Sequence, residues 1–358
     1  MSDGSLEVGF VGAGVIAWAH ALAIRSMVKA EVVNAHVGAV FDSDGDKSAS
    51  FASSHGIVAA ASALEVADRC DAVFVCTPTG SHLEAVEAVA SSGRALFCEK
   101  PLGRDLRESE QIVAVARSAG LHTQVGLVLR TAPVFVALAA LVRDGSLGRP
   151  MAVQFRDDQF FPIQGHYAST WRSDRDIAGS GALLEHSIHD LDILGVCLGE
   201  VVSVSAQTGN YARYEGIEDV AAGVLRFASG TLGTLVSVWH QVLSRPSTRR
   251  VEVLFDSGVA TFDDDFSGPL QLQTSAGTEV RECPPPGWVS RLPLPDDARG
   301  IAVRAYAEQD RAFLDAVASG TMPSPGLAEA LLAHRLVDAW YRSAASGGSP
   351  TIPGASEP

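Results

Sequence analysis

Residues 6–17 read Leu6-Glu7-Val8-Gly9-Phe10-Val11-Gly12-Ala13-Gly14-Val15-Ile16-Ala17, and the fold is predicted outward from this stretch. Residues 6–11 form a short apolar run of the kind found in buried strands. A glycine-rich turn follows, and a helical pattern of apolar residues continues from it to residue 27. Because strand, turn and helix follow one another directly, the stretch predicts the first strand–helix unit of a parallel sheet.

The turn fits the pattern G-x-G-x-x-[GA], with Gly12, Gly14 and Ala17 at the small positions. Gly12 permits a tight turn, Gly14 lets the backbone approach a pyrophosphate, and Ala17 allows close packing of helix on strand. The helix then starts at Val15 and Ile16, where free N–H groups and the helix dipole favour an anion. The motif therefore predicts a dinucleotide-binding site at Gly12, Gly14, Val15 and Ile16.

A carboxylate ends the second predicted strand, residues 37–41. Asp42 lies beyond the offset of about 20 residues that is usual after this motif, but only one helix and one strand intervene. A carboxylate at that place accepts the ribose hydroxyls of NAD and repels the 2′-phosphate of NADP. Ser43 follows, with no arginine to receive that phosphate, so NAD is favoured over NADP. A merely solvated aspartate at the strand end is the alternative.

The chain changes pattern near residue 130. Alternating strands and helices before this point predict a doubly wound Rossmann domain over residues 1–130. Longer strand-like runs on short turns then indicate antiparallel meanders in an α+β domain over residues 131–345. The tail, residues 346–358, is rich in Gly, Ser and Pro and is expected to be disordered.

Strands are expected at 6–11, 37–41, 72–76, 95–98, 123–129, 151–155, 201–207, 220–227, 231–240 and 250–255. Helices are expected at 15–27, 47–55, 82–91, 106–119, 134–143, 183–197, 303–319 and 327–343, and residues 157–177 are expected to be irregular.

Composition narrows the class of protein and its partners. Of 358 residues, 47% are hydrophobic and 19% charged, as in ordinary globular proteins. We expect no secretory signal, no membrane partner and no nucleic acid partner, because the start lacks a basic region, no long apolar stretch occurs and the net charge is −15. Five scattered cysteines without CxxC spacing suit a reducing cytoplasm, with neither disulfides nor a metal site.

Two further segments place polar residues in otherwise apolar surroundings. The first runs from Cys76-Thr77-Pro78-Thr79-Gly80-Ser81-His82, through one helix and one strand, to Glu99-Lys100-Pro101. The second is Gly179-Ser180-Gly181-Ala182-Leu183-Leu184-Glu185-His186-Ser187-Ile188-His189-Asp190-Leu191-Asp192. Together with the glycine loop, they resemble the glucose–fructose oxidoreductase / inositol dehydrogenase family (Gfo/Idh/MocA). The resemblance covers nearly the whole chain, and Glu-Lys-Pro in this context is its most specific mark.

The resemblance implies a Rossmann domain followed by a domain with a large, open, mainly antiparallel sheet. Family members transfer a hydride between a nicotinamide cofactor and a secondary alcohol or ketone of a sugar or cyclitol. Their usual catalytic pair, carried over residue by residue, is Lys100 and His189. Glu185 stands where the inositol dehydrogenase branch commonly has aspartate, so it is the candidate third catalytic group despite its longer side chain.

The chemistry explains why these residue types are needed. Oxidation of a secondary alcohol removes a hydride and a proton, and a protein group must take the proton. His189 is a candidate base because imidazole titrates near neutral pH. Lys100 follows a Rossmann strand, where ligands of such sheets bind, and its ammonium can stabilise the developing alkoxide. Burial beside a cationic nicotinamide would favour neutral Lys100 and make it the base instead. The sequence leaves both assignments open.

Spacing supports a shared site on the second segment. Glu185 and His189 are four residues apart and therefore share one face of a helix, and Asp192 lies three residues further on that face. The apolar neighbours make these polar groups costly to bury unless they have partners or a function. We therefore expect Lys100, Glu185 and His189 to contact the substrate, with a solvated polar helix face as the alternative.

Other residues extend the predicted cofactor site. Thr77, Pro78 and His82 resemble the family's loop and helix start that flank the adenosine and ribose, and an exposed helix position is the alternative for His82. Glu99 is expected either to meet the nicotinamide ribose or to pair with a nearby cation. Lys100 is expected to contact the cofactor as well as the substrate.

Weaker candidates lie in the second half of the chain. Trp171-Arg172 resembles a family pair at the nicotinamide end of the cofactor. Arg130 follows the last Rossmann strand, Tyr167 lies in the irregular region, and His240 ends a meander strand that could face the cleft. These three are candidate substrate-binding residues, although a core aromatic or a surface arginine would show the same pattern.

Two other functions fit the same motifs. Some relatives use NAD transiently to cleave a glycoside, and a sugar-sensing regulator would keep the fold without catalysis; intact Lys100 and His189 argue against the regulator. The family's sheet carries the active site on one face and is commonly covered by a second subunit on the other. The apolar strands 220–227 and 231–240 fit that arrangement, so we expect a homodimer or homotetramer.

Overall fold

The computed structural model describes residues 4–264, 266–295 and 298–354, which cluster into two compact units. Unit 1 takes in the chain as far as Val128 together with Pro286–Leu331. Unit 2 takes in Leu129–Pro285 and the chain from Leu332 onward. Among the described residues, no helix is long and apolar enough to cross a membrane.

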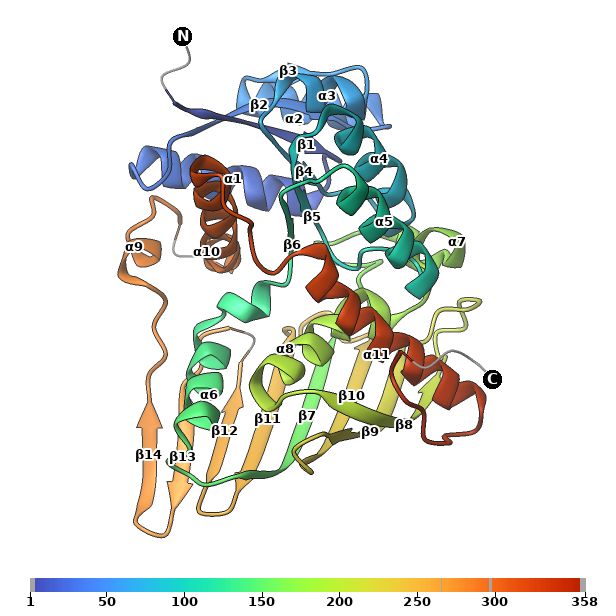
Figure 1. Ribbon diagram of the computed structural model, residues 1–358, viewed down its shortest axis with the longest axis vertical. Coiled ribbons are helices and arrows are strands. Elements are labelled where there is room, and N and C mark those ends of the chain that lie inside the picture. The colour runs from blue at the N-terminus through green and yellow to red at the C-terminus, as the bar shows by residue number, and fades with distance from the viewer. Residues whose placement is uncertain (1–3, 265, 296–297, 355–358) are drawn as a thin grey trace. The chain divides into compact units, whose positions relative to one another are not determined.

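Unit 1 is built on a parallel sheet of six strands in the order β3-β2-β1-β4-β5-β6 (Figure 1). This is the strand order of a Rossmann fold, so the predicted fold is confirmed. The sequence missed a two-residue strand and the short helix after it, because neither is long enough to show a period. The strands are β1 (Leu6–Val11), β2 (Ala35–Phe41), β3 (Val58–Ala59), β4 (Ala72–Val75), β5 (Ala95–Cys98) and β6 (Thr123–Val125). Their helices are α1 (Val15–Lys29), α2 (Gly45–His55), α3 (Ala63–Arg69), α4 (His82–Ser92) and α5 (Leu106–Ser118).

A late segment of the chain completes the core of unit 1. Helix α9 (Gly287–Ser290) and helix α10 (Ala298–Ser319) belong to this unit, and α10 packs along α1. The ring of Phe313 lies edge-on to Phe74 and Phe97 of the sheet. The expected second domain, residues 131–345, therefore included a segment that the structure assigns to the first unit. Its apolar face is needed to cover the sheet.

Unit 2 is built on a sheet of eight strands in the order β14-β13-β12-β11-β7-β10-β9-β8. Neighbouring strands are antiparallel except β7 and β10, which pair in parallel. The expected mainly antiparallel sheet is therefore confirmed. The strands are β7 (Pro150–Phe160), β8 (Val201–Gly209), β9 (Val220–Phe227), β10 (Leu232–His240), β11 (Thr248–Phe255), β12 (Val259–Asp263), β13 (Leu270–Thr274) and β14 (Gly277–Arg281).

Helices cover one face of this sheet (Figure 1). Alternate residues of the central strands, such as Phe155, Leu235 and Val253, are buried beneath them. Residues of opposite parity lie on the other face, where Val224 and Leu232 are about half exposed, at 49% and 50%. The helices of unit 2 are α6 (Pro133–Asp144), α7 (Arg175–Ala178), α8 (Ile188–Leu198) and most of α11 (Leu327–Ala345).

Strand β7 is longer than its sequence suggests. The prediction ended at residue 155 because Asp157, Asp158 and Gln159 look like loop residues. All three are buried, and the two aspartates have basic partners, which allows them to occupy a central strand. The expected irregular region therefore begins only after Phe160.

The expected disordered tail is structured as far as the description extends. Thr351 forms an antiparallel bridge with Val204 of β8, with N–H to O distances of 2.8 and 3.0 Å. Its hydroxyl also donates to the carbonyl of Ala339 at 2.7 Å. Small polar residues here make specific backbone contacts, so composition alone was misleading. Residues 355–358 lie outside the described part of the chain.

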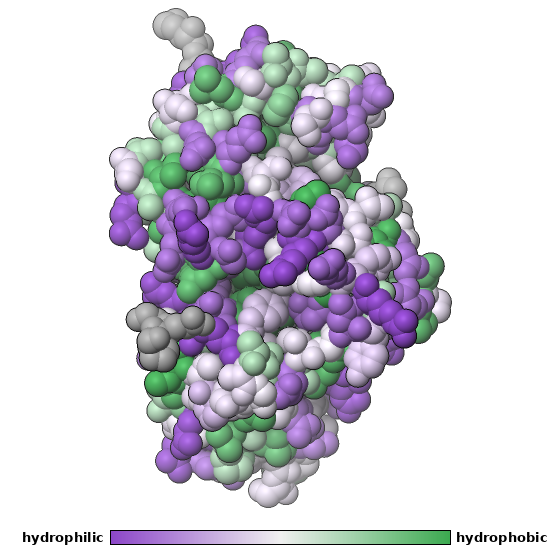
Figure 2. Space-filling model, turned by 90° about the vertical axis from the view of Figure 1, so that its right-hand side faces the viewer, coloured by the Kyte–Doolittle hydropathy of each residue, from purple (hydrophilic) through white to green (hydrophobic). Residues whose placement is uncertain are grey.

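One side of the surface is shown in Figure 2. Hydrophilic side chains are spread across this view, and apolar side chains lie among them in smaller groups. A mixed surface of this kind is usual for a globular protein.

Replacing Thr351 tests whether the tail contributes to stability. Thr351→Val keeps the shape but removes a hydroxyl that donates to Ala339 and Val204. We expect the free energy of unfolding to fall by about 1 kcal/mol. Urea unfolding measures it, with Thr278→Val on the exposed strand β14 as the control. Equal stability of the two variants would contradict a structural role for the tail.

Candidate active site

The glycine loop of unit 1 has the geometry that the motif predicts. Gly12 has φ of +98°, and a Cβ there would lie 2.6 Å from the backbone of Cys76, so no other residue fits. Gly14 is extended and precedes α1, with open space where a side chain would be. No side chain in the described chain caps this helix. The N–H groups of Val15 and Ile16 therefore suit a pyrophosphate.

Asp42 lies against this loop. Its carboxylate accepts the N–H of Ala13 at 2.7 Å and that of Asp44 at 2.9 Å. The strand-end aspartate is therefore not merely solvated, because it ties the end of β2 to the glycine loop. Each oxygen keeps a further lone pair for a ribose hydroxyl.

The loop after β4 contains Thr77 and Pro78 and leads into α4. The Thr77 hydroxyl is buried and has no hydrogen-bond partner among the described residues, which fits an orientation toward a ligand. His82 differs from both expectations, because its ring is 1% exposed rather than on the helix surface or open to an adenosine. Its nitrogens face the carbonyls of Thr77 at 3.0 Å and Leu102 at 3.1 Å. His82 thus links the loop after β4 to the loop after β5, where the backbone carbonyls need hydrogen-bond donors.

Glu99 and Lys100 follow β5 directly. One Glu99 oxygen accepts the N–H of Lys100 at 3.2 Å, and the other lies 3.0 Å from Nε2 of His20. Of the two expected roles for Glu99, the structure contains the pairing with a basic group, and Asp310 and Glu99 raise the pKa of His20 to about 10 against the effect of burial. The sequence analysis missed His20 and Asp310; the only signal was a histidine on an apolar helix face.

In unit 2, Glu185 lies in a π-helical turn, Leu183–Ser187, that leads into α8. Glu185 is 2% exposed, and its carboxylate accepts a hydrogen bond from Nε of Arg172 at 3.1 Å. The Arg172 guanidinium also lies over the ring of Trp171, 4.3 Å from its centroid. The expected Trp-Arg pair is therefore joined to the expected third catalytic residue. Isolated π-helical turns are frequent at functional sites.

His189 and Asp192 follow on α8, and both are buried. Arg130 donates to both oxygens of Asp192, at 2.8 and 2.7 Å. This bidentate pair holds the predicted helix face against the turn that contains Arg130. A solvated polar face, the alternative considered for Glu185 and His189, is wrong because their side chains are nearly inaccessible.

The two remaining substrate candidates lie elsewhere in unit 2. Tyr167 packs against the rings of His166 and Phe160. His240 follows the strand parity of the face opposite the helices, and its Nε2 lies 3.5 Å from Asp158. Since α8 covers the other face, His240 is not on the side of the sheet that carries His189. The expected role of His240 in substrate binding therefore loses its structural basis.

A buried polar cluster lies beneath α8 that the sequence did not reveal. Arg249 of β11 donates to Asp190 at 2.7 Å and lies 3.5 Å from Asp157 of β7. His186 and Ser187 also contact Asp157, at 3.0 and 2.9 Å. Burial, and then the nearby charge of Asp157, raise the pKa of Asp190 to about 8. These groups fix the helix that carries His189 onto the sheet.

Glu218 anchors the start of the same helical segment. Its carboxylate accepts the N–H groups of Gly181 at 2.7 Å and Leu183 at 2.9 Å, and the hydroxyl of Tyr341 at 2.8 Å. Its carbonyl accepts the N–H of Ala182. Burial raises the pKa of Glu218. A Cβ at Gly181 would lie 1.8 Å from the Glu218 carbonyl, so this approach requires glycine.

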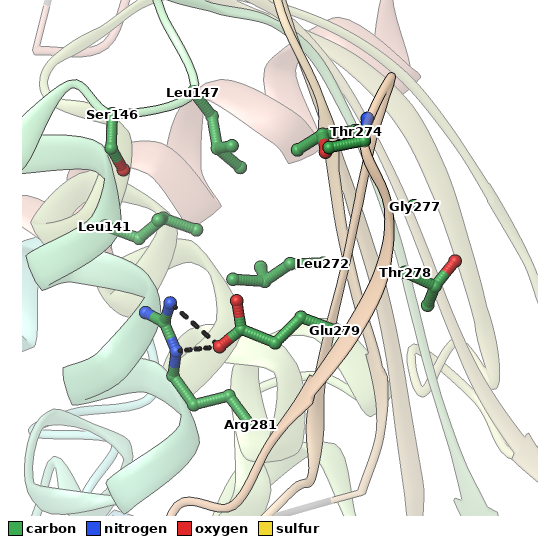
Figure 3. Close-up of a pocket in the computed structure, with 10 residues that line it drawn as sticks. Leu141, Ser146, Leu147, Leu272, Thr274, Gly277, Thr278, Glu279 and Arg281 are labelled. Atoms are coloured by element: carbon green, nitrogen blue, oxygen red, sulfur yellow. Dashed lines mark hydrogen bonds and ion pairs between the residues drawn. The ribbon is translucent and has the colours of Figure 1, made fainter.

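A separate pocket in unit 2 lies between the end of α6 and the strands β13 and β14 (Figure 3). Leu141, on α6, and Leu272, on β13, point toward each other across it, and Arg281 pairs with Glu279 at 3.3 Å. None of the predicted catalytic or cofactor residues lines it. The motifs, rather than this pocket, therefore locate the candidate site.

Comparison with known proteins agrees with the fold and the motifs. Residues 6–127 match the model of an oxidoreductase family with an NAD-binding Rossmann fold, and residues 135–261 match the GFO/IDH/MocA C-terminal domain. Fold and glycine loop together define an NAD-binding oxidoreductase. The chain belongs to the GFO/IDH/MocA family.

Individual relatives are similar over much or all of their length. Inositol 2-dehydrogenase of Rhizobium meliloti (strain 1021) is 27% identical over 95% of this chain and 97% of its own. The 1,5-anhydro-D-fructose reductase of Ensifer adhaerens is 31% identical over 63% of this chain and 66% of its own. A levoglucosan dehydrogenase structure in complex with NADH and levoglucosan superposes with a TM-score of 0.83 at 24% identity, covering 98% of this chain and all of that chain.

Titration of Asp190 predicts a dependence of stability on pH. An unfolded aspartate loses its proton at about pH 4, whereas folded Asp190 keeps it up to about pH 8. The folded state binds more protons in this window, so the contribution of Asp190 is fully present below about pH 4 and is lost as the pH rises through about 8. In the wild type, Asp190 makes the free energy of unfolding fall by up to about 1.4 kcal/mol for each pH unit in this window. Asp190→Asn should remove this part of the fall.

Urea unfolding at several pH values across this window measures the two slopes. Asp46→Asn, at an exposed position, is the control and should retain the wild-type slope. Identical slopes in Asp190→Asn and the wild type would show that the cluster does not hold the extra proton.

Proposed function

We propose that this enzyme transfers a hydride between NAD and a secondary alcohol or ketone of a neutral sugar or cyclitol. The observation that carries the proposal is the position of Lys100 directly after β5. In the parallel sheet, β1, β4 and β5 are neighbours, so Lys100 emerges at the same edge as the glycine loop. Ligands of open parallel sheets bind at that edge.

The predicted cofactor residues are proposed to act as follows. Gly12, Gly14, Val15 and Ile16 would hold the pyrophosphate, and Asp42 the adenosine ribose. Thr77 and Pro78 would flank the nucleotide, with Glu99 and Lys100 nearer the nicotinamide. From the second unit, Trp171 and Arg172 are proposed at the nicotinamide end, as in the family. Bound NAD supplies the hydride acceptor.

Lys100 and His189 are proposed as the catalytic residues. The Lys100 ammonium holds the reacting oxygen and stabilises negative charge on it, while His189 takes the hydroxyl proton. Glu185 is assigned a positioning role, because its buried carboxylate is already committed to Arg172. This pairing already occupies the carboxylate and favours a mechanism with two catalytic residues.

Charge pairing around the second segment supports a neutral substrate. Arg130 forms a bidentate pair with Asp192, and Arg172 pairs with Glu185. Each arginine is thus matched by a carboxylate, which weakens its attraction for a substrate carboxylate or phosphate. Arg130 and Tyr167 are proposed to contact substrate hydroxyls. The relatives' names, including inositol 2-dehydrogenase and D-apiose dehydrogenase, point to the same class of polyols.

Activity assays test this proposal. The protein is incubated with NAD and a panel of myo-inositol, D-apiose and levoglucosan, and NADH is followed by absorbance. We expect stoichiometric NADH with at least one polyol. Lys100→Met should lower kcat by about 100-fold or more while NAD still binds, because the lysine acts on the reacting oxygen. His189→Gln should remove the acidic limb of the pH profile.

Two outcomes would overturn the proposal. One is release of sugar from a glycoside without net NADH, which indicates glycoside cleavage. The other is full activity of Lys100→Met, which would exclude the assigned role of the lysine. As a control, Arg107→Met, on α5 of the same unit, should leave kcat unchanged.

We also propose a cytoplasmic homo-oligomer. All five cysteines are free thiols, which suits a reducing compartment. The uncovered face of the eight-stranded sheet carries Val224 and Leu232 on adjacent strands, each about half exposed. Exposed apolar groups on one face of a sheet favour burial against a second copy. Apolar side chains on this face therefore support a dimer or tetramer.

A charge placed on this face should dissociate the oligomer. Leu232→Glu would bury a charged carboxylate at the proposed interface, and removing that charge from water is unfavourable. Sedimentation velocity should therefore show the wild type as a dimer or tetramer and Leu232→Glu as a monomer. Leu64→Glu, at an exposed apolar position on α3, is the control and should not change the assembly. A monomeric wild type would contradict the proposal.

A further inference from the structure

His20 lies inside unit 1, on the face of α1 that packs against the sheet, and is fully buried. Aromatic rings surround it, with Phe74, Phe97 and Tyr306 at centroid distances of 5.1 to 5.3 Å. Such surroundings suit a neutral apolar side chain. A polar ring in this place therefore needs specific partners.

Both nitrogens of His20 face carboxylates. Nδ1 lies 2.8 Å from Asp310 of α10, and Nε2 lies 3.0 Å from Glu99. An imidazolium donates from each nitrogen and therefore satisfies both carboxylates at once. Burial alone would lower the pKa of His20, but Asp310 and then Glu99 raise it to about 10.

Contacts on its remaining sides hold the Glu99 carboxylate in place. Its second oxygen accepts the N–H of Lys100 at 3.2 Å. The carboxylate also lies so close to the backbone after β6 that a Cβ at Gly126 would be 2.4 Å from it. Glu99 is therefore held between the imidazolium, the main chain at Lys100 and the end of the neighbouring strand.

We propose that His20, oriented by Asp310, is a positioning residue that fixes the main chain at Lys100 through the Glu99 carboxylate. The inference deepens the proposed function, because it rests on Lys100 acting at the reacting oxygen. The chain of contacts runs from α10 through α1 to the end of β5, entirely inside unit 1. It gives the late segment Pro286–Leu331 a part in the reaction besides covering the sheet.

A purely structural role would predict a different result. Buried ion pairs contribute little net stability compared with apolar residues of the same shape, so stability alone gives weak reason for three ionisable groups here. A positioning role requires that disturbing His20 changes the placement of Lys100 and the rate of the chemical step. Displacements of about 1 Å at a catalytic group can lower a rate by about 100-fold.

Two variants test the proposal. His20→Gln keeps one donor but loses the cation, and Asp310→Asn keeps the shape while weakening the hold on the ring. The control is Met27→Ala, which removes a fully buried side chain from the same helix without touching the polar chain. Asp310→Asn serves as the milder test if His20→Gln folds poorly.

The first measurement is amide hydrogen exchange of the peptide containing Lys100, in the full protein without substrate. We expect faster exchange there in His20→Gln and Asp310→Asn than in Met27→Ala at matched global stability. The second is steady-state kinetics with a polyol that the wild type oxidises. We expect kcat to fall by about 10-fold to 100-fold in His20→Gln, with the Kd for NAD little changed.

The outcomes separate this inference from the proposed function. If the wild type is active but both variants match Met27→Ala in exchange and in kcat, the positioning role of His20 is wrong. If the wild type forms no NADH with any polyol, the proposed function fails, and exchange at Lys100 still decides whether His20 fixes that main chain.

Discussion

A carboxylate that is buried must be matched by donors, and this constraint organises a polar network in each unit. In unit 1, Glu99 is matched by His20 and the Lys100 N–H. In unit 2, Glu218 is matched by the backbone N–H groups of Gly181 and Leu183, at the start of the helical segment that carries His189. Because an unmatched buried charge costs several kcal/mol, each network strongly favours one local arrangement. Catalytic groups built on such networks are held in place before any ligand binds.

Charge matching also shapes the chemistry that the site supports. The glycine loop presents backbone N–H groups, which suit the phosphates of a dinucleotide. Around the second segment, Arg130 and Arg172 are each committed to a carboxylate. The groups left to act on a substrate are then few, which fits the small set of residues required for hydride and proton transfer from a neutral alcohol.

Sequence patterns were reliable where a motif coincides with a regular spacing of apolar residues. The stretch from Leu6 to Ala17 predicted β1, the turn and α1, and the strand order of the sheet confirmed the Rossmann fold. Patterns failed where polar residues are buried, as at Asp157 in β7, or where a segment returns to an earlier unit, as α10 does. Local periodicity reports which face is apolar, but not which distant segment will cover it.

The sequence by itself determined the two folds, the cofactor class and the residues worth testing, because glycine spacing, apolar periods and Glu99-Lys100-Pro101 are local properties of the chain. Tertiary structure alone decided how those residues are supported. His20 and Asp310 stand 290 positions apart but contact each other, and His20 also contacts Glu99. His82 is buried and links two loops by hydrogen bonds, and His240 lies on the face of the sheet opposite α8. Such pairings depend on which elements pack together, and spacing along the chain carries no record of that.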